Sequence, residues 1–310
     1  MSDFAAADRL PPAALAKAWF AAARPHTLSA AAVPVLVGSA LAAAQGAFDW
    51  ALFGWTLLGS LLVQIGTNFT DEFADHGATA SAHKFLAPHK VIARGLLSER
   101  AVKRGTVVVF GVATLIGLRL VAHAGWPLLL VCAVALACAV GYSAGPLPLG
   151  DLALGELVVF VMMGPVMVLA TVYVQTQQWQ ALALWHSLPV GALVTAILMA
   201  NNLRDAEEDA THGRSTLVTV FGVPAVRAAH LALVALAYAS PLVALLSGWG
   251  SAWLLLPWLT LPLALRVQRL LRSEGARERL HAALKGTSGL HLSYGLLLAA
   301  ALLLDAPGAT

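Results

Sequence analysis

The sequence predicts an all-α integral membrane protein, with nine transmembrane helices around a central cavity and a polar site at the cytoplasmic face. Of its 310 residues, 59% are hydrophobic and only 11% are charged, whereas soluble domains carry about 25% charged residues. Uncharged stretches of spanning length, about 20 residues each, recur along the chain. Acidic segments follow directly on two of them. We expect one membrane domain at residues 25–304, between an N-terminal segment at residues 1–24 and a tail at residues 305–310.

The N-terminal segment ends in a short helix that we expect to lie at the membrane surface. Residues 11–24 combine Trp19 and Phe20 with Lys17 and Arg24, a mixture typical of an interfacial helix. A signal peptide is the competing interpretation, because the stretch is rich in alanine and has a basic flank. The long polar leader and the spanning length of the next apolar run favour a retained membrane span.

The first half of the domain contains four predicted spans. A polar loop at residues 71–104 separates the second span from the third. The four spans cover residues 27–48, 50–70, 105–124 and 125–143. A tight turn near Gly46 joins the first two spans, and Trp126-Pro127 opens the fourth.

The second half contributes five more predicted spans. The uncharged runs at residues 157–203 and 228–265 are each long enough for two crossings of about 20 residues. Polar or glycine-rich breaks divide them at residues 177–180 and 247–250. The last span covers residues 286–304, which brings the predicted total to nine.

Charge predicts the orientation of these spans. With the N-terminus in the cytoplasm, every Lys and Arg except Arg119 falls on the cytoplasmic side, including a basic loop at residues 266–285. The C-terminus then lies on the opposite side, and both acidic segments reach the cytoplasmic face. The pI of about 9.1 does not indicate nucleic-acid binding, because the basic residues are spread over short loops between spans.

Each acidic segment presents a row of oxygen ligands on one helix face. Residues four or eight positions apart share a face, because an α-helix has about 3.6 residues per turn. Charged residues beside hydrocarbon are costly and usually functional. The two rows consist of Asn68, Asp71 and Asp75, and of Asn201, Asp205 and Asp209.

Two acidic rows at a membrane surface favour a magnesium-dependent diphosphate site. Mg²⁺ takes one or two protein carboxylates and completes its shell with water and substrate phosphates. A substrate with a diphosphate head and a hydrocarbon tail is a prenyl diphosphate. The metal would assist its ionisation to an allylic cation. A dry cavity with aromatic walls would protect that cation. The basic residues suited to the diphosphate are Arg24, Lys84, Lys90, Arg94, Arg204 and Arg214.

The two acidic segments and several shorter motifs of the sequence resemble those of a known family. The second acidic segment is similar to the second aspartate motif of the UbiA superfamily of intramembrane aromatic prenyltransferases, and in particular to its 1,4-dihydroxy-2-naphthoate polyprenyltransferase branch, which serves menaquinone synthesis. The resemblance covers residues 20–304. The matching segment reads Asn201-Asn202-x-Arg204-Asp205-x-x-x-Asp209-x-x-x-Gly213-Arg214-x-Thr216-Leu217. Further matches are Arg24-Pro25-x-Thr27-Leu28, Tyr142-x-x-Gly145-Pro146-x-Pro148, Gly155-Glu156, Gly164-Pro165 and Tyr173-x-Gln175-Thr176.

The resemblance implies a nine-helix fold, a cytoplasmic active site and Mg²⁺-dependent transfer of a polyprenyl group from polyprenyl diphosphate to 1,4-dihydroxy-2-naphthoate, with release of diphosphate and CO₂. The expected catalytic and metal-binding residues are Asp71, Asp75, Asp205 and Asp209. The expected substrate-binding residues are Arg24, Asn68, Glu72, Lys90, Arg94, Tyr142, Asn201, Asn202, Arg204 and Arg214. A basic pocket attracts an acidic aromatic acceptor, but it does not choose between naphthoate, 4-hydroxybenzoate and other acceptors.

The first acidic motif departs from the family pattern. The family usually has Asn-Asp-x-x-Asp, where this chain has Asp71-Glu72-x-x-Asp75. The branch also often has Asn-Arg or Ser-Arg at the position of His89-Lys90. Both changes keep side chains that can bind the metal and the diphosphate. They put in doubt the identity of the acceptor and not the transfer of the prenyl group.

Other interpretations of these residues remain possible at the level of sequence. The carboxylates could cap loops, the basic residues could serve only orientation, and Tyr142 could anchor the interface. Histidines in the two acidic segments fit no common zinc spacing, and Cys132 and Cys138 are expected to be packing residues. Transporters also carry intramembrane acids, but their sites favour the bilayer midplane rather than span ends.

Overall fold

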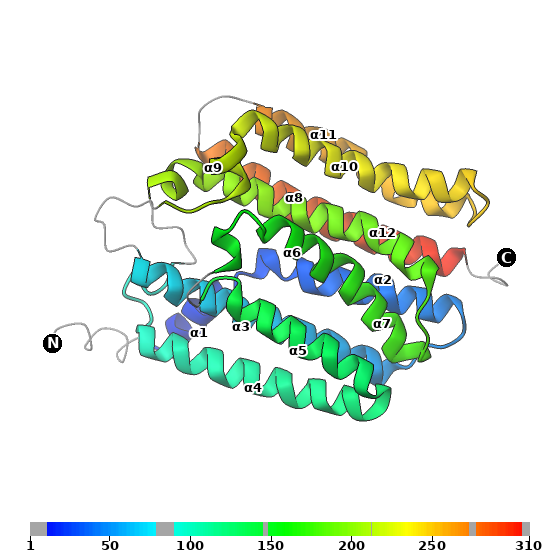
Figure 1. The fold of residues 1–310 in the computed structure, drawn as a ribbon, viewed down its shortest axis with the longest axis horizontal. Coiled ribbons are helices and arrows are strands. Elements are labelled where there is room, and N and C mark those ends of the chain that lie inside the picture. The colour runs from blue at the N-terminus through cyan, green and yellow to red at the C-terminus, as the bar shows by residue number, and fades with distance from the viewer. Residues whose placement is uncertain (1–10, 79–89, 145–147, 212, 273–276, 306–310) are drawn as a thin grey trace.

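Long apolar helices lie side by side along the long axis of the molecule (Figure 1). The computed structural model describes residues 11–78, 90–144, 148–211, 213–272 and 277–305, with side chains omitted for residues 75–78. The first half contains α1 (Pro12–Ala22), α2 (Ser29–Ala44), α3 (Trp50–Ala78), α4 (Glu99–Ala124), α5 (Trp126–Gly141), α6 (Gly155–Val161) and α7 (Met167–Thr176). The second half contains α8 (Ala181–Thr211), α9 (Leu217–Phe221), α10 (Val223–Leu246), α11 (Leu261–Arg272) and α12 (Arg277–Leu304).

The helices define an integral membrane protein. Within the described residues, seven helical segments are long and apolar enough to cross a membrane. The count rises to eight if α1 and α2, which meet at a bend of 54°, form one span. Helix α5 is a shorter apolar helix of 16 residues. The all-α membrane architecture is therefore confirmed, while nine spans and their orientation stay predictions.

The breaks between helices agree with the predicted turns. Helix α7 ends at Thr176 and α8 begins at Ala181, which is the predicted break at residues 177–180. Helix α10 ends at Leu246, and a 3₁₀ segment, Ala252–Thr260, leads into α11. The polar and glycine-rich residues at these positions end the apolar helices as expected.

The acidic rows lie on helix ends as predicted, but helix extends into both ends of the predicted loop at residues 71–104 and covers most of the one at residues 266–285, which corrects the predicted bounds. Helix α3 continues to Ala78 and α8 to Thr211, so each acidic row extends a membrane helix by more than a turn. The predicted basic loop at residues 266–285 is wrong, because α11 and α12 cover most of it. Helix α11 buries Val267 and Leu271 and leaves its arginines on the outside, so the charge marks one helix face rather than a loop.

Small residues let the central helices approach closely. A Cβ atom on Gly295 of α12 would lie 2.2 Å from Cγ1 of Val33 on α2, and one on Gly164 would lie 2.6 Å from Cα of Gly191 on α8. Helix association in membranes depends on such close packing, since lipid is as apolar as the side chains. Gly164 lies in a π-helical turn, Met162–Val166, that joins α6 to α7. This turn brings methionine side chains to the wall of the cavity described below.

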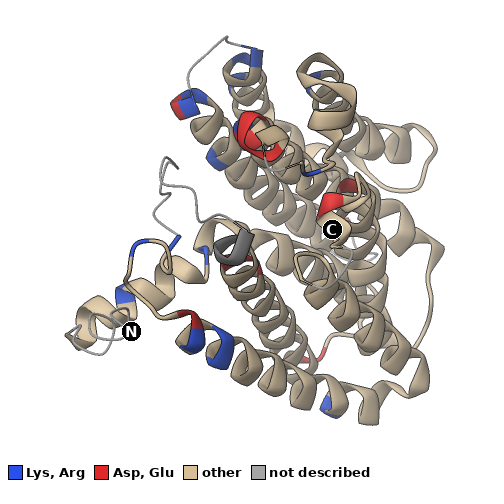
Figure 2. Cartoon of the chain, turned by 60° about the vertical axis from the view of Figure 1, so that its left-hand side comes forward, with Lys and Arg blue, Asp and Glu red and all other residues tan. Residues whose placement is uncertain are grey.

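Charged side chains gather at one end of the bundle. Figure 2 turns that end forward, and most Lys, Arg, Asp and Glu residues lie there, while the helix shafts carry few charges. The carboxyl end of α3 and that of α8 both reach this end, so the two acidic rows lie at the same end of the molecule.

Candidate active site

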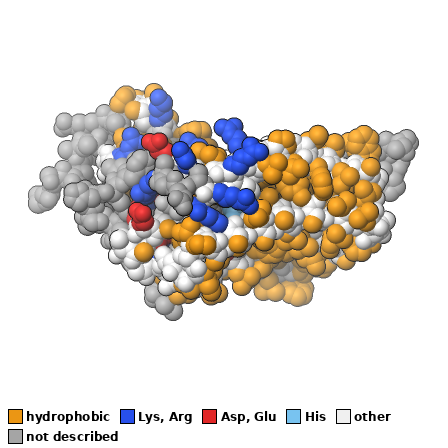
Figure 3. All heavy atoms as spheres, turned by 90° about the horizontal axis from the view of Figure 1, so that it is seen from above, with side chains coloured by type: hydrophobic (Ala, Val, Ile, Leu, Met, Phe, Trp, Pro, Cys, Tyr) orange, Lys and Arg blue, Asp and Glu red, His pale blue; other side chains and the backbone are white. Residues whose placement is uncertain are grey.

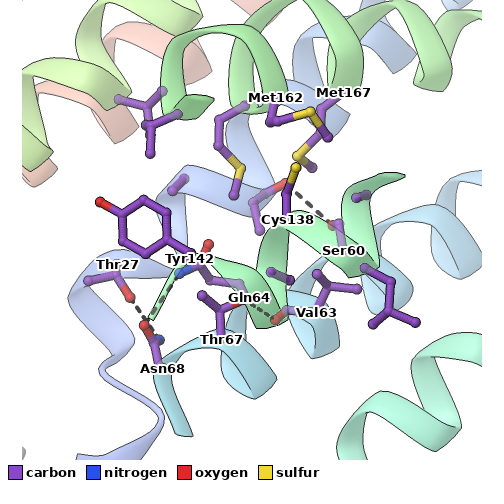
Figure 4. A pocket seen from close by; sticks show the side chains of 18 of the residues that line it. Thr27, Ser60, Val63, Gln64, Thr67, Asn68, Cys138, Tyr142, Met162 and Met167 are labelled. Carbon is purple, nitrogen blue, oxygen red and sulfur yellow. Dashed lines mark hydrogen bonds between the residues drawn. The ribbon is translucent and has the colours of Figure 1, made fainter. Parts of the chain in front are cut away.

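A cavity of about 610 Å³ joins the two acidic rows. Helices α2 to α8 and the segments next to them supply its walls, with one residue from α12. Its polar end contains three carboxylates and four cations: Asp71, Asp205, Asp209, Arg24, Lys90, Arg204 and Arg214. The rest of its wall is mostly apolar, with side chains from α4, α5 and α7. Figure 4 shows Met162, Met167 and Cys138 on one side of this space and Asn68 and Gln64 on the other.

Asn68 and Asp71 of the first row are held by the turn between α1 and α2. The side-chain amide of Asn68 donates hydrogen bonds to the carbonyl of Ala23 at 2.8 Å and to Oγ1 of Thr27 at 3.0 Å. Arg24 lies in the same turn, with φ of 49°, and forms an ion pair with Asp71. The left-handed backbone of Arg24 breaks the helix there, so its guanidinium turns toward α3.

The second row lies on α8 and is paired in the same way. Arg204 donates to Asp205 from Nε at 2.8 Å and from Nη2 at 2.5 Å, and Nη2 also donates to Oδ1 of Asn201 at 2.9 Å. Asp209 is only 4% exposed and lies 3.3 Å from Nη1 of Arg214. Buried carboxylates need such partners, because an unpaired buried charge is strongly destabilising.

The segment between α5 and α6 contributes Tyr142, Ser143 and Gly150 to the wall of the cavity. Tyr142 lines the cavity, and its ring rests on Gly150 and Gly155. A Cβ atom on Gly155 would lie 3.0 Å from the Tyr142 hydroxyl oxygen, so a side chain there would displace the tyrosine. Asn202 donates a hydrogen bond of 2.9 Å to the buried carboxylate of Glu156, which ties α8 to the start of α6.

Most predicted site residues meet at this cavity, and two do not. Glu72 is buried and does not line the cavity; its carboxylate accepts a hydrogen bond of 3.0 Å from the backbone N–H of Ile92 and lies 3.9 Å from Nη2 of Arg24. Arg94 is exposed and does not line the cavity. The side chain of Asp75 lies outside the described part of the structure. The predicted residues that line the cavity are Arg24, Asn68, Asp71, Lys90, Tyr142, Asn201, Asn202, Arg204, Asp205, Asp209 and Arg214.

Two residues of the site had no signal in the sequence. Asp151 lies in a short 3₁₀ turn, Leu149–Asp151, and pairs with Nε of Arg214 at 2.6 Å. Ser143 donates a hydrogen bond of 3.2 Å to Asp71. Both partners are more than 60 residues away along the chain, so only the fold reveals these contacts.

The donor set fits magnesium better than a metal held by protein alone. Within the described residues, no group of three or more His, Cys, Asp or Glu side chains could hold a metal ion. Mg²⁺ needs only one or two carboxylates when phosphates complete its shell. Asp71, Asp205 and Asp209 offer such carboxylates beside cations suited to phosphate.

The fold and this site define a class of protein, a membrane-embedded enzyme whose cavity has a charged end and apolar walls. Residues 31–303 match the UbiA prenyltransferase family. The chain therefore belongs to the UbiA prenyltransferase family and is a prenyltransferase.

The chain is also similar to individual bacterial proteins over most of its length. The chain is 31% identical over 282 residues to a protein of Bacillus subtilis (strain 168) named 1,4-dihydroxy-2-naphthoate octaprenyltransferase, covering 91% of each chain. It is 32% identical over 288 residues to a protein of the same name from Mycobacterium tuberculosis, covering 92% of this chain and 96% of the relative.

Solved structures confirm the fold. A UbiA homologue from Aeropyrum pernix K1 superposes with a TM-score of 0.64 at 18% identity, covering 88% of this chain and 97% of that one. A UbiA homologue from Archaeoglobus fulgidus bound to GPP and Mg²⁺ gives a TM-score of 0.60 at 14% identity, covering 91% and 99%. At these identities the structures support the architecture alone.

Proposed function

We propose that this chain transfers a polyprenyl group from polyprenyl diphosphate to 1,4-dihydroxy-2-naphthoate, releasing diphosphate and CO₂, as a step of menaquinone biosynthesis. The observation that carries the proposal is one cavity in which both acidic rows and four cations occupy one end, while apolar side chains form the rest of the wall. The names of the Bacillus and Mycobacterium relatives favour the naphthoate acceptor.

The charged end of the cavity would bind the diphosphate. Guanidinium groups make paired hydrogen bonds to phosphate oxygens, and Arg24, Arg204 and Arg214 place three of them around the cavity together with Lys90. Each arginine is already held by a carboxylate, so its position does not depend on the substrate. These cations would orient the leaving group and balance its charge.

The carboxylates of both rows would hold Mg²⁺. Asp71, Asp205 and Asp209 line the cavity, and Asp75 is the fourth proposed ligand. When bound, the ion would supply charge withdrawal from the leaving diphosphate. The homologue of the same fold from Archaeoglobus fulgidus is bound to GPP and Mg²⁺, and we propose the same pairing of substrate and cofactor here.

The apolar walls would bind the prenyl tail and exclude water. Met162 and Met163 of the turn between α6 and α7, and Met167 at the start of α7, line the cavity. Methionine is polarisable and flexible, so it adapts to an irregular hydrocarbon chain. A dry wall also protects an allylic cation from hydrolysis. The acceptor is itself an anion, which the basic end of the cavity would attract.

An assay with a panel of acceptors tests the proposal. Purified protein is given a polyprenyl diphosphate, Mg²⁺ and either 1,4-dihydroxy-2-naphthoate or 4-hydroxybenzoate, and prenylated products are measured by mass spectrometry. We expect product from the naphthoate together with CO₂ release, and loss of product on adding EDTA. If only 4-hydroxybenzoate gave a product, the proposed acceptor would be wrong, while the proposed prenyl transfer would stand.

A further inference from the structure

A cluster of arginines lies outside the cavity, on the outer face of α10 and α11. It comprises Arg227 on α10 and Arg266, Arg269 and Arg272 on α11, and we call it the α10–α11 arginine cluster. None of these residues lines the cavity, whose wall includes no residue of either helix. The reaction proposed above therefore gives the cluster no role.

Two hydrogen bonds show how α10 lies against α11 and the 3₁₀ segment before it. Tyr238 contacts Thr260, the last residue of that segment, at 2.6 Å, and His230 contacts Gln268 of α11 at 2.9 Å. From the first contact to the second, the residue number on α10 falls by eight and that of its partner rises by eight, so the two segments run antiparallel. Arg227 lies one turn before His230, and Arg272 lies one turn after Gln268. These two arginines are therefore neighbours at the same level of the bundle.

The remaining two arginines continue the cluster along α11. Arg266, Arg269 and Arg272 follow at intervals of three residues and are all exposed, so they form one row on the helix surface. Helices α10 and α11 form the edge of the bundle at the top of Figure 1, and Figure 3 views the molecule from that side. Basic side chains gather there, at the border of a broad apolar surface.

Within the described residues, no carboxylate neutralises the cluster. None of its four arginines takes part in a described ion pair, in contrast to Arg24, Arg204 and Arg214 at the cavity. The Nε atom of Arg227 is buried and has no hydrogen-bond partner. A buried N–H group without an acceptor is costly, so the Arg227 side chain would gain from an arrangement in which it donates to an acceptor.

Exposed leucines adjoin the cluster on the side toward the middle of the helices. Leu231 lies one turn beyond Arg227, and Leu265 and Leu261 lie one and two turns before Arg269. All three are exposed. The surface thus has cations at one level and hydrocarbon at the next, which is the order of groups in a phospholipid.

We propose that the α10–α11 arginine cluster is a binding site for an anionic phospholipid. The guanidinium groups would bind the phosphate, and Leu231, Leu261 and Leu265 would contact an acyl chain. Basic pockets between membrane helices commonly bind anionic headgroups, and the planar guanidinium matches phosphate oxygens in pairs. We favour a bound phosphate because the exposed arginines of α11 have no described carboxylate partner and lie beside exposed leucines.

Thermal unfolding of the full-length protein in detergent, titrated with phosphatidylglycerol, tests this proposal independently of enzymatic activity. We expect the unfolding temperature to rise saturably with phosphatidylglycerol but not with phosphatidylcholine. The variant Arg227→Gln/Arg272→Gln should need about thirtyfold more lipid for half of the effect, because each interfacial arginine contributes roughly a factor of five. Arg227→Lys/Arg272→Lys should retain part of the response.

The matched control removes two positive charges from another helix. Lys103→Gln/Arg104→Gln changes two exposed residues of α4 and should respond to phosphatidylglycerol like the unaltered protein. An equal response in both double variants, or an equal effect of phosphatidylcholine, would overturn the proposal. So would inorganic phosphate, if it stabilised the protein as strongly at the same phosphate concentration. If the double variant does not fold, Arg272→Gln alone should weaken the response about fivefold, and an unchanged midpoint would count against the site.

Discussion

Replacing Asp151 by Asn tests whether this residue keeps Arg214 in place at the cavity. Arg214 lies between two carboxylates, with Asp151 at 2.6 Å and Asp209 at 3.3 Å. If Asp209 binds the metal, Asp151 becomes the carboxylate that still holds the arginine. Asp151→Asn removes that charge and leaves Arg214 to pair with Asp209, which then competes with metal and diphosphate.

The structure limits the size of this effect. The side chains of Arg214 and Asp151 are 35% and 33% exposed, so solvent screens the pair and it contributes about 0.5–1 kcal/mol. That free energy corresponds to a factor of roughly two to five. The backbone contact between the same segments, from the N–H of Ala153 to the carbonyl of Ser215 at 2.6 Å, does not involve the carboxylate. The loop should therefore keep its fold.

Steady-state kinetics with varied prenyl diphosphate separates binding from turnover. We expect the KM for the donor to rise about two- to fivefold with kcat nearly unchanged, and Asp151→Glu to restore part of the loss. The matched control is Glu99→Gln, which removes a comparable ion pair with Lys103 at 2.6 Å on α4, away from the cavity. An unchanged KM for Asp151→Asn, or the same rise for Glu99→Gln, would refute the reasoning.

Four further predictions concern the acidic rows, the neighbouring Glu72 and the metal. Asp205→Ala and Asp209→Ala should each reduce turnover at least about a hundredfold without a change in helix content by circular dichroism, and normal activity in both would exclude the second row from catalysis. Asp71→Asn should lower turnover by about tenfold or more, and full activity would show that Asp71 is not an essential ligand. Glu72→Ala should cost about 1–3 kcal/mol of stability, because it leaves the N–H of Ile92 without its acceptor, and a lower unfolding temperature should show this loss. Chelation by EDTA should stop turnover, and Mg²⁺ but not Ca²⁺ should restore it, since the two ions differ in preferred geometry.

Much of the fold could be predicted because membrane helices carry a strong local signal. Uncharged runs predicted the apolar helices, and polar residues predicted the breaks at residues 177–180 and 247–250. The helical period also placed Asn68 and Asp71 on one face, and Asn201, Asp205 and Asp209 on another, and all five line the cavity. These inferences needed only residues within a few turns of one another.

The errors came from charges whose role depends on the neighbouring helix. The arginines of α11 were assigned to a loop, although buried Val267 and Leu271 continue the helix beneath them. Glu72 adjoins Asp71 in the sequence, but successive helix residues point about 100° apart. Its carboxylate therefore does not line the cavity and contacts the N–H of Ile92 and the guanidinium of Arg24 instead. Asp151 was missed because its link to Arg214 joins two segments that sequence reading treats separately.

The pairing of acids with arginines explains how a strongly charged site can persist inside a membrane protein. A carboxylate or guanidinium taken out of water alone would cost several kcal/mol, so each acid at the cavity needs a cation beside it.

Under the proposed function, substrate binding would exchange the partners of these charged groups. Diphosphate would replace the carboxylates as partner of the arginines, and Mg²⁺ would replace the arginines as partner of the carboxylates. Neither row would be left unpaired before or after binding, and the exchange concerns three pairs, Arg24 with Asp71, Arg204 with Asp205 and Arg214 with Asp209. On this argument metal and diphosphate should bind cooperatively, because either one alone would leave half of each broken pair without a partner.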